Sequence, residues 1–178
     1  MRELTDDEFA ALRDKSAFEI VKFLKIPVWQ IPFMIHRGRV LFKQYTDNIR
    51  LVVGMKPVLA ELKKRGYHLA ILTSNTKATV DTFLQKYELD FFDYVKSEKN
   101  LFGKHHSLKK ILAEKKLKKD EVVYVGDEVR DIEACHKIKM DIISVTWGFN
   151  SKKILEKYKP TYIADTPEEI LQYLTSEI

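Results

Sequence analysis

The sequence contains a single cysteine, Cys135, so a disulfide bond within the chain is excluded. This composition is typical of proteins kept in a reducing compartment. The first residues, MRELTDDEFAALRDK, contain no apolar core of a signal peptide, and no window approaches the roughly 18 apolar residues of a membrane-spanning helix. We therefore expect a cytoplasmic protein with no membrane partner.

Several common binding motifs are also missing. The chain has neither the phosphate loop GxxxxGK[ST] nor the dinucleotide-binding pattern GxGxxG. His68, His105 and His106 do not form a zinc-ligand spacing with Cys135. The lysine-rich residues 108–119 have apolar positions at helical spacing and no interleaved aromatics, which favours a solvated helix face. We therefore expect no nucleic-acid partner.

The chain contains enough hydrophobic residues to form a hydrophobic core. Of its 178 residues 45% are hydrophobic, which fits one domain or a core with a small appendage. Lys and Arg number 31 against 26 Asp and Glu, a net charge of +5. This modest excess suits a small anionic substrate, and it suits ordinary solubility equally well.

The first part of the chain, residues 1–52, is predicted to be helical. Thr5 and Ser16 are each followed three positions later by a glutamate, the pattern of a capping box at a helix start. The second of these helices ends before Pro27. A third helix is expected broadly over residues 32–51, although Gly38 weakens that prediction.

The second part, residues 53–178, alternates strands and helices. Strands are expected near residues 68–73, 92–95, 122–125, 141–146 and 161–164, and helices near 56–66, 76–87, 107–115, 129–137, 151–158 and 166–174. Short apolar strands separated by helices predict an α/β fold with a mostly parallel sheet and helices on both faces. Ligands of such sheets bind beyond the carboxyl ends of the strands.

Two strand ends carry polar residues that chemistry could use. The first is Thr73-Ser74-Asn75, directly before a helix whose N-terminus would favour an anion. Simple helix capping by Ser74 or Asn75 explains the same residues equally well. The second is Lys104, which follows Gly103 just before a helix, although a loop lysine taken alone is usually solvated.

A third strand end, VVYVGDEVRD at residues 122–131, gathers three acids. Asp127 follows the strand and Asp131 lies four residues further, so both can share one side of a site. Two carboxylates this close repel each other unless a cation lies with them. A site that offers a small number of protein oxygen ligands, with room left for water molecules and a phosphate, suits Mg²⁺. The alternative is that the acids only interact with the dipole at the helix N-terminus. This would explain one acid, but it does not easily explain three.

Taken in order, these strand ends resemble the haloacid dehalogenase-like hydrolases, especially their phosphoglycolate phosphatase-like branch with a helical cap. The resemblance covers nearly the whole chain, and the late SVTWGFN is similar to a strand-end loop of that branch. It implies a three-layer, Rossmann-like core at residues 53–178, an N-terminal helical cap at residues 1–52, and a small phosphorylated substrate.

The resemblance also implies a role for each site residue. Ser74 would hydrogen-bond the transferring phosphoryl group, with Asn75 beside it and Thr73 as the less favoured registration. Lys104 would neutralise the nucleophile and the phosphate. Asp127 and Asp131 would hold Mg²⁺, directly or through water. Such groups position a phosphoryl group and spread its charge, which is most of what phosphoryl transfer requires.

The chain departs from the family at one motif. Members begin with a strand ending in DxDxT, whose first aspartate is the nucleophile and whose second is the general acid/base, and this sequence contains no such motif. Asp6, Asp7, Asp14 and Asp47 do not follow a buried strand. We therefore expect a gap in the sheet, between the strands that end at Thr73 and Val125, unless these close together or another segment fills it.

Three expectations follow from this departure. Met1 would be an internal start, so an in-frame strand with DxDxT should be encoded upstream. The 178-residue chain should bind Mg²⁺ weakly and be inactive, because covalent catalysis needs its nucleophile. An open gap would favour association, so a homo-oligomer is an alternative to a monomer.

Other functions compete with a magnesium-dependent phosphatase. A non-catalytic relative could bind a phosphorylated ligand or a protein partner through the same strand ends. A response-regulator receiver lacks its expected acid pair here, and a dehalogenase would not need a metal. Substrate contacts could come from Trp29, Phe33, His36 and Arg37, although core packing of the aromatics is favoured, or from Trp147.

Overall fold

The computed structural model describes residues 5–34, 37–38, 49–97 and 103–176 and has a mixed α/β fold, as predicted. The chain divides into two compact units. The first unit combines Met1–Pro27 with Phe102–Thr166, and the second combines Val28–Leu101 with Pro167–Ile178. The division into a cap, residues 1–52, and a core, residues 53–178, remains a prediction. No helix in the described ranges is long and apolar enough to span a membrane.

The first unit contains a parallel three-stranded sheet. Its strands are β3 (Val123–Gly126), β4 (Asp141–Val145) and β5 (Tyr162–Ala164), hydrogen-bonded in that order. Helix α7 (Val129–Ile138) packs on β3 and β4, and α6 (Lys104–Lys115) packs on α7. The unit also contains η3 (Lys119–Glu121) and α8 (Lys152–Lys157). Its largest fully buried apolar residues are Val129, Ile132, Cys135, Ile142, Ile143 and Leu155.

Cys135 lies on α7 inside this core and is fully buried. Burial raises the pKa of its thiol to about 12. Because the thiolate is the reactive form, this thiol is expected to be inert at neutral pH.

Two N-terminal helices belong to the same unit. Helices α1 (Asp6–Arg13) and α2 (Ala17–Phe23) begin with the predicted capping boxes at Thr5 and Ser16. The Arg13 guanidinium donates to the carbonyls of Phe149 (2.9 Å) and Gly148 (3.1 Å). The helices are therefore anchored to the loop that follows β4.

The side chain of Asn150 completes this anchor. It is 2% exposed, its Oδ1 accepts from the Val129 N–H at 2.9 Å, and its Nδ2 donates to the carbonyls of Arg13 (2.9 Å) and Lys15 (3.0 Å). One amide thus satisfies the first N–H of α7 and two carbonyls between α1 and α2.

We expect Asn150→Ala to lower the free energy of unfolding by about 2 to 4 kcal/mol, because it leaves the buried Val129 N–H and the Lys15 carbonyl without their partner. The Arg13 carbonyl still accepts from the Ser151 N–H. Urea denaturation followed by circular dichroism measures the loss. The matched control is Gln85→Ala, an exposed amide on a helix, which should change stability by about 0.5 kcal/mol or less. Equal effects of the two substitutions would contradict the anchoring role.

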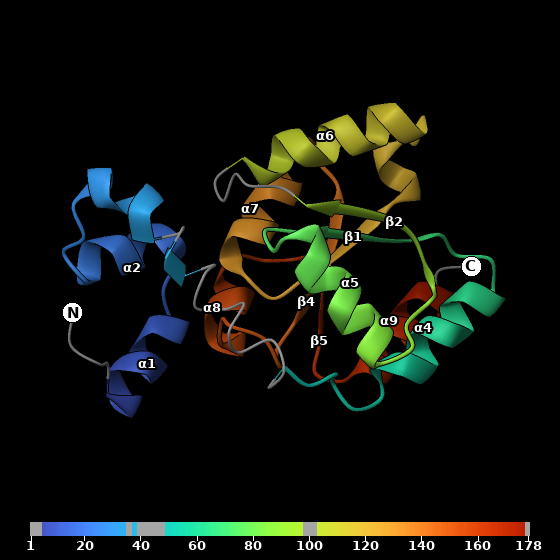
Figure 1. The fold of residues 1–178 in the computed structure, drawn as a ribbon, viewed down its shortest axis with the longest axis horizontal. Coiled ribbons are helices and arrows are strands. Elements are labelled where there is room, and N and C mark those ends of the chain that lie inside the picture. Colours follow the sequence, from blue (N-terminus) through green and yellow to red (C-terminus); the bar gives the residue numbers. More distant parts are fainter. Residues whose placement is uncertain (1–4, 35–36, 39–48, 98–102, 177–178) are drawn as a thin grey trace. The chain divides into compact units, whose positions relative to one another are not determined.

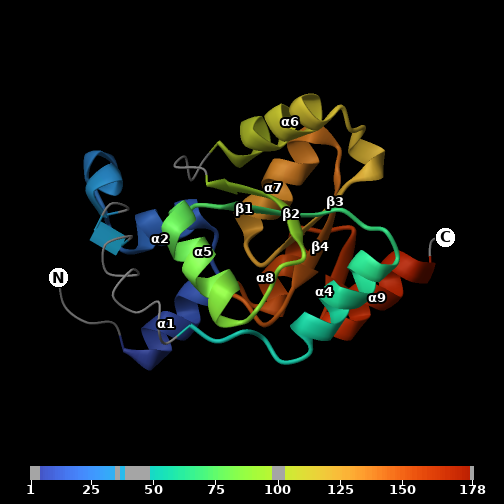
Figure 2. The ribbon, with the colours of Figure 1, turned by 45° about the vertical axis from the view of Figure 1, so that its right-hand side comes forward.

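The second unit contains a parallel pair of strands, β1 (Leu69–Thr73) and β2 (Phe92–Ser97). Helix α5 (Lys77–Lys86) packs on β2, and α4 (Met55–Lys64) packs on α9 (Pro167–Ser176), as seen in Figures 1 and 2. Its buried apolar residues are Val58, Leu62, Val80, Leu89 and Ile170. Asp93 accepts from Lys63 Nζ and from the Leu69 N–H, all at 2.8 Å, and these bonds lower the pKa of Asp93 to about 2.

The described strands form two sheets, which separate between β1 and β3, where the sequence predicted a gap. All three strand pairings are parallel, as predicted. In the described ranges β1 pairs only with β2, and β3 pairs only with β4.

The helical prediction for residues 32–51 is wrong at its C-terminal end. Residues 31–34 and 37–38 are helical, after the short η1 (Val28–Gln30), but residues 49–52 have no regular structure. His36 lies outside the described residues. Core packing is also wrong for Trp29 and Phe33, which are 78% and 66% exposed, and Arg37 is exposed as well.

Candidate functional site

An ion pair between Lys104 and Asp131 forms the centre of the candidate site in the first unit. Lys104 Nζ contacts Asp131 Oδ1 and donates to the Tyr124 hydroxyl at 3.0 Å. The side chains of Lys104 and Asp131 are only 17% and 3% exposed. Two of the predicted site residues are therefore in direct contact and largely removed from water.

This contact explains the position of Lys104. Lys104 was expected in a loop, but it is the first residue of α6, after Gly103 at the N-cap. A cation at a helix N-terminus is disfavoured by the helix dipole. Asp131, in the first turn of α7, supplies the opposing negative charge.

The environment keeps Lys104 charged. Burial alone would lower the pKa of the Lys104 ammonium, but the neighbouring Tyr124 and Asp131 raise it, and the net pKa lies above its ordinary value. Burial raises the pKa of Tyr124 to about 12, and the Asp131 carboxylate adds to that shift. At neutral pH the cluster therefore holds a cation, an anion and a neutral phenol.

The pKa of Tyr124 gives a test at high pH. An unfolded tyrosine has a pKa of about 10, so the stability contributed by neutral Tyr124 is fully present below pH ~10 and is lost as the pH rises towards 12. In an ultraviolet titration we expect Tyr124→Phe to remove the ionisation step near pH 12. If Tyr124→Phe instead removed an ionisation step near pH 10, Tyr124 would not have the raised pKa of a buried phenol.

Asp127 lies in the turn between β3 and α7 and is half-buried. Its Oδ2 accepts from the Phe149 N–H at 2.6 Å, and its carbonyl accepts from the Asn150 N–H at 3.2 Å. The two strand-end segments GDEVRD and SVTWGFN therefore meet at Asp127.

Two glycines make room for these acids. A Cβ atom at Gly126 would lie 2.5 Å from Asp131 Oδ2, and one at Gly148 would overlap the carboxylate of Asp127. A side chain at either position would displace one of the two carboxylates.

Glu128, the third acid, is paired differently. Its Oε1 accepts from Arg130 Nη2 at 2.5 Å. Burial raises the pKa of Glu128, and the attraction of Arg130 offsets this only in part. Glu128 is the N-cap residue of α7, but its side chain makes no capping hydrogen bond. Helix capping therefore does not account for Glu128, whereas Asp131 lies in the first turn of α7, where the helix dipole favours an acid.

The donor set suits a hard cation in type. Asp127 and Asp131 offer carboxylate oxygens, which Mg²⁺ prefers. Within the described ranges, no three His, Cys, Asp or Glu side chains lie close enough together to hold a metal ion by themselves. An ion here would therefore need oxygens of water or of a bound ligand, as is common for Mg²⁺.

Thr73, Ser74 and Asn75 lie in the second unit, where β1 ends. The Thr73 hydroxyl accepts from the Asn75 N–H at 3.1 Å, and the Ser97 hydroxyl donates to the Asn75 carbonyl at 2.5 Å. The N-cap of α5 is Thr76, whose hydroxyl accepts from the Thr79 N–H. Capping by Ser74 or Asn75 is therefore wrong.

A comparison with protein families matches residues 1–145 to the family described as haloacid dehalogenase-like hydrolase. The chain belongs to this family.

Two similar proteins are phosphatases by name. A phosphoglycolate phosphatase of Synechococcus elongatus is 30% identical over 173 residues, which are 97% of this chain and 82% of the relative. The pyrophosphatase PpaX of Bacillus mycoides is 34% identical over 158 residues, which are 86% of this chain and 74% of the relative.

A solved structure shows the same fold. It is a haloacid dehalogenase-like family hydrolase of Streptococcus pneumoniae, with a TM-score of 0.77 and 21% identity. The match covers 98% of this chain and 83% of the other.

The sequence did not identify three residues around the acids of this haloacid dehalogenase-like chain: Tyr124, Arg130 and Asn150. Tyr124 reads as an ordinary apolar strand residue. Arg130 could have been found, because it stands between the acids of GDEVRD. Trp147 is half-buried.

Proposed function

We propose that this haloacid dehalogenase-like chain carries the phosphate-binding and magnesium-binding residues of a phosphatase for small phosphorylated metabolites. The observation that carries the proposal is the buried Lys104–Asp131 ion pair, beside Asp127 at the end of β3. The names of its relatives, phosphoglycolate phosphatase and pyrophosphatase, support the substrate class.

Each residue has a physical role in this proposal. Lys104, whose pKa is raised, supplies a permanent positive charge towards a phosphate. Asp127 and Asp131 hold Mg²⁺, which neutralises phosphate charge when bound. The Ser74 hydroxyl donates to a phosphoryl oxygen. In the described part of the chain no residue hydrogen-bonds with that hydroxyl, so it can act as a donor.

We further propose that residues 1–178 alone do not turn over a phosphoester. They contain no Asp-x-Asp pair anywhere, so the nucleophile and the general acid/base of DxDxT are both missing. The same observation favours a second function, a non-catalytic protein that binds a phosphorylated ligand or a protein partner through the same residues.

Binding of inorganic phosphate, measured by titration calorimetry with and without Mg²⁺, tests the proposal. We expect Mg²⁺ to tighten phosphate binding, Asp127→Asn to abolish that gain, and Ser74→Ala to weaken binding about tenfold through one lost hydrogen bond to a charged group. Asp120→Asn, at an exposed carboxylate, is the matched control and should leave binding unchanged. If the unmodified chain binds phosphate with the same affinity in the presence and absence of Mg²⁺, the proposal is refuted.

A further inference from the structure

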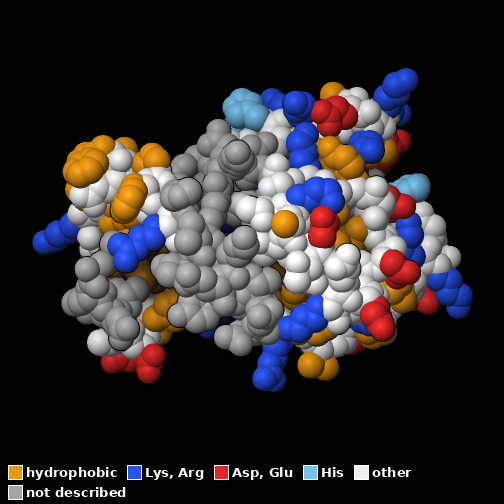
Figure 3. Space-filling model, viewed as in Figure 1, with side chains coloured by type: hydrophobic (Ala, Val, Ile, Leu, Met, Phe, Trp, Pro, Cys, Tyr) orange, Lys and Arg blue, Asp and Glu red, His pale blue; other side chains and the backbone are white. Residues whose placement is uncertain are grey.

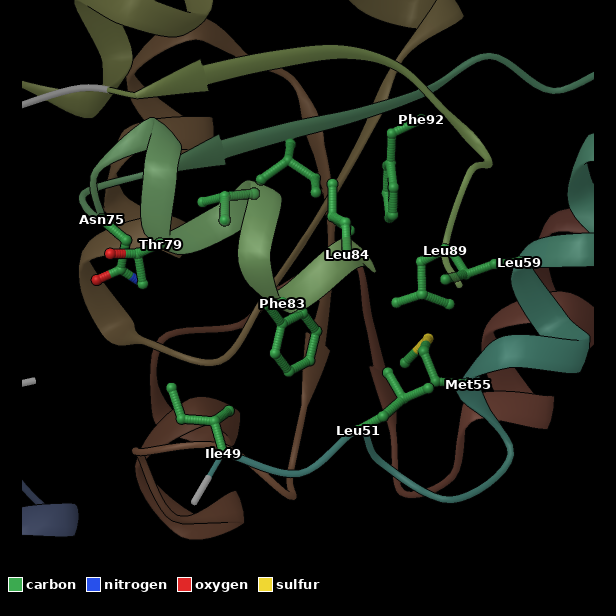
Figure 4. Close-up of a pocket in the computed structure, with 12 residues that line it drawn as sticks. Ile49, Leu51, Met55, Leu59, Asn75, Thr79, Phe83, Leu84, Leu89 and Phe92 are labelled. Carbon is green, nitrogen blue, oxygen red and sulfur yellow. The ribbon is translucent and has the colours of Figure 1, made fainter. Parts of the chain in front are cut away.

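The second unit contains an apolar cavity of about 350 Å³. It is bordered by the face of α5, by β1 and β2, by α4, and by the segment that precedes α4 (Figure 4). Its volume lies at the small end of the range for ligand pockets, about 300 to 1,000 Å³. Ten of its twelve lining residues are apolar: Ile49, Leu51, Met55, Leu59, Ile71, Val80, Phe83, Leu84, Leu89 and Phe92.

The two polar lining residues, Asn75 and Thr79, lie together at one end (Figure 4). Met55, Leu59 and Leu89 lie at the other end. The hydroxyl of Thr79 forms a hydrogen bond of 2.9 Å with the hydroxyl of Thr76. The cavity is therefore amphipathic, with the Asn75 amide as the polar group at its polar end.

The polar end adjoins a proposed phosphate contact. Asn75 directly follows Ser74, and its backbone is fixed by the hydrogen bonds to Thr73 and Ser97. A phosphate held by Ser74 would therefore lie near Asn75, at the polar end of the cavity. The hydroxyls of a sugar would lose their hydrogen bonds inside this cavity, whereas an alkyl or aryl group would lose none.

We propose that the cavity binds the apolar part of the substrate, so that the chain prefers phosphate monoesters of short alkyl or aryl alcohols over those of polyols. This inference rests on the proposed function, because it takes Ser74 as a phosphate contact. It adds the substrate class and assigns specificity to the residues on α5, β1 and α4.

A chain-length series tests the inference. Binding of n-alkyl phosphates from ethyl to octyl, and of glycerol phosphate, is measured by titration calorimetry with Mg²⁺ present. Each methylene placed in the cavity is expected to tighten Kd about fourfold until the cavity is filled. Glycerol phosphate is expected to bind no better than ethyl phosphate, and Asn75→Ala should weaken every ester.

Two cavity-filling variants are the decisive controls. Leu84→Trp on α5 and Leu59→Phe on α4 should each flatten the dependence on chain length. Leu117 lies outside the cavity and is 42% exposed, so Leu117→Trp should leave the dependence of Kd on chain length unchanged. Melting temperatures show which variants are folded, and the second filling variant replaces the first if one is not.

The outcomes separate the two proposals. A Kd that does not depend on chain length, with Mg²⁺-dependent phosphate binding intact, overturns this inference and leaves the proposed function standing. A chain-length dependence that Asp127→Asn and omission of Mg²⁺ leave unchanged overturns the proposed function and supports the cavity. Self-association that Leu84→Trp abolishes would show that a second copy fills the cavity, and this also overturns the inference.

Discussion

Replacing Lys104 by methionine is expected to lower the free energy of unfolding by about 3 to 5 kcal/mol. The substitution keeps most of the side-chain volume but leaves the carboxylate of Asp131, 2% exposed, without its cation. It also removes the hydrogen bond to the Tyr124 hydroxyl. A buried charge that has lost its partner is among the most destabilising changes a single substitution can make.

A double-mutant cycle distinguishes the ion pair from general damage at α6. The double variant Lys104→Met/Asp131→Asn should be at least about 2 kcal/mol more stable than the sum of the single losses predicts, because no charge is then left unpaired. Lys77→Met is the matched control, since Lys77 makes an exposed pair with Asp81 that is worth about 0.5 kcal/mol or less. Additive losses, or a Lys104→Met loss as small as the control, would contradict the prediction.

The same pair has a pH dependence of known sign. Because the folded-state pKa of Lys104 lies above its ordinary value, the stability it contributes is fully present below pH ~10.4. That contribution is lost as the pH rises through the higher folded-state pKa. The unmodified chain and Lys104→Met should therefore differ less in their free energies of unfolding when the pH is above the folded-state pKa of Lys104.

The sequence predicted the elements better than the residues that end them. Apolar runs and capping boxes located β3, β4, α1 and α2, because these signals are local. The run Thr-Ser-Asn-Thr after β1 offers four possible caps. The choice of Thr76 depends on where β1 stops pairing with β2, and on Ser97, which is 22 residues from the Asn75 carbonyl that it contacts.

The site shows the same limit. Asp127 and Asp131 were identified as a pair from their spacing, and the structure places both at the start of α7. The partner of Asp131 is 27 residues earlier in the chain, and no local pattern indicates that Lys104 begins a helix. The anchoring role of Asn150 depends on contacts 135 and 137 residues away in sequence.

Purified protein of residues 1–178 is expected to show no magnesium-dependent hydrolysis of an aryl phosphate. Losses on the order of 10⁶ in kcat follow removal of the nucleophile from an enzyme that uses covalent catalysis. Asp127 and Asp131 do not replace it: one carboxylate accepts from the Phe149 N–H, and the other is bound by Lys104. In the proposed site both carboxylates are ligands of Mg²⁺, which leaves neither as a nucleophile directed at phosphorus.

The matched experiment supplies the missing group. A chain extended at its N-terminus by an apolar strand ending in Asp-x-Asp-x-Thr should hydrolyse the aryl phosphate, and replacing the first aspartate of that motif by asparagine should abolish turnover. Asp127→Asn in the extended chain should reduce turnover in the same assay, since Lys104 and the acids would then serve a complete site. Hydrolysis by the 178-residue chain that requires Mg²⁺ and disappears in Asp127→Asn would show that residues 1–178 already contain a nucleophile, and would refute the inactivity.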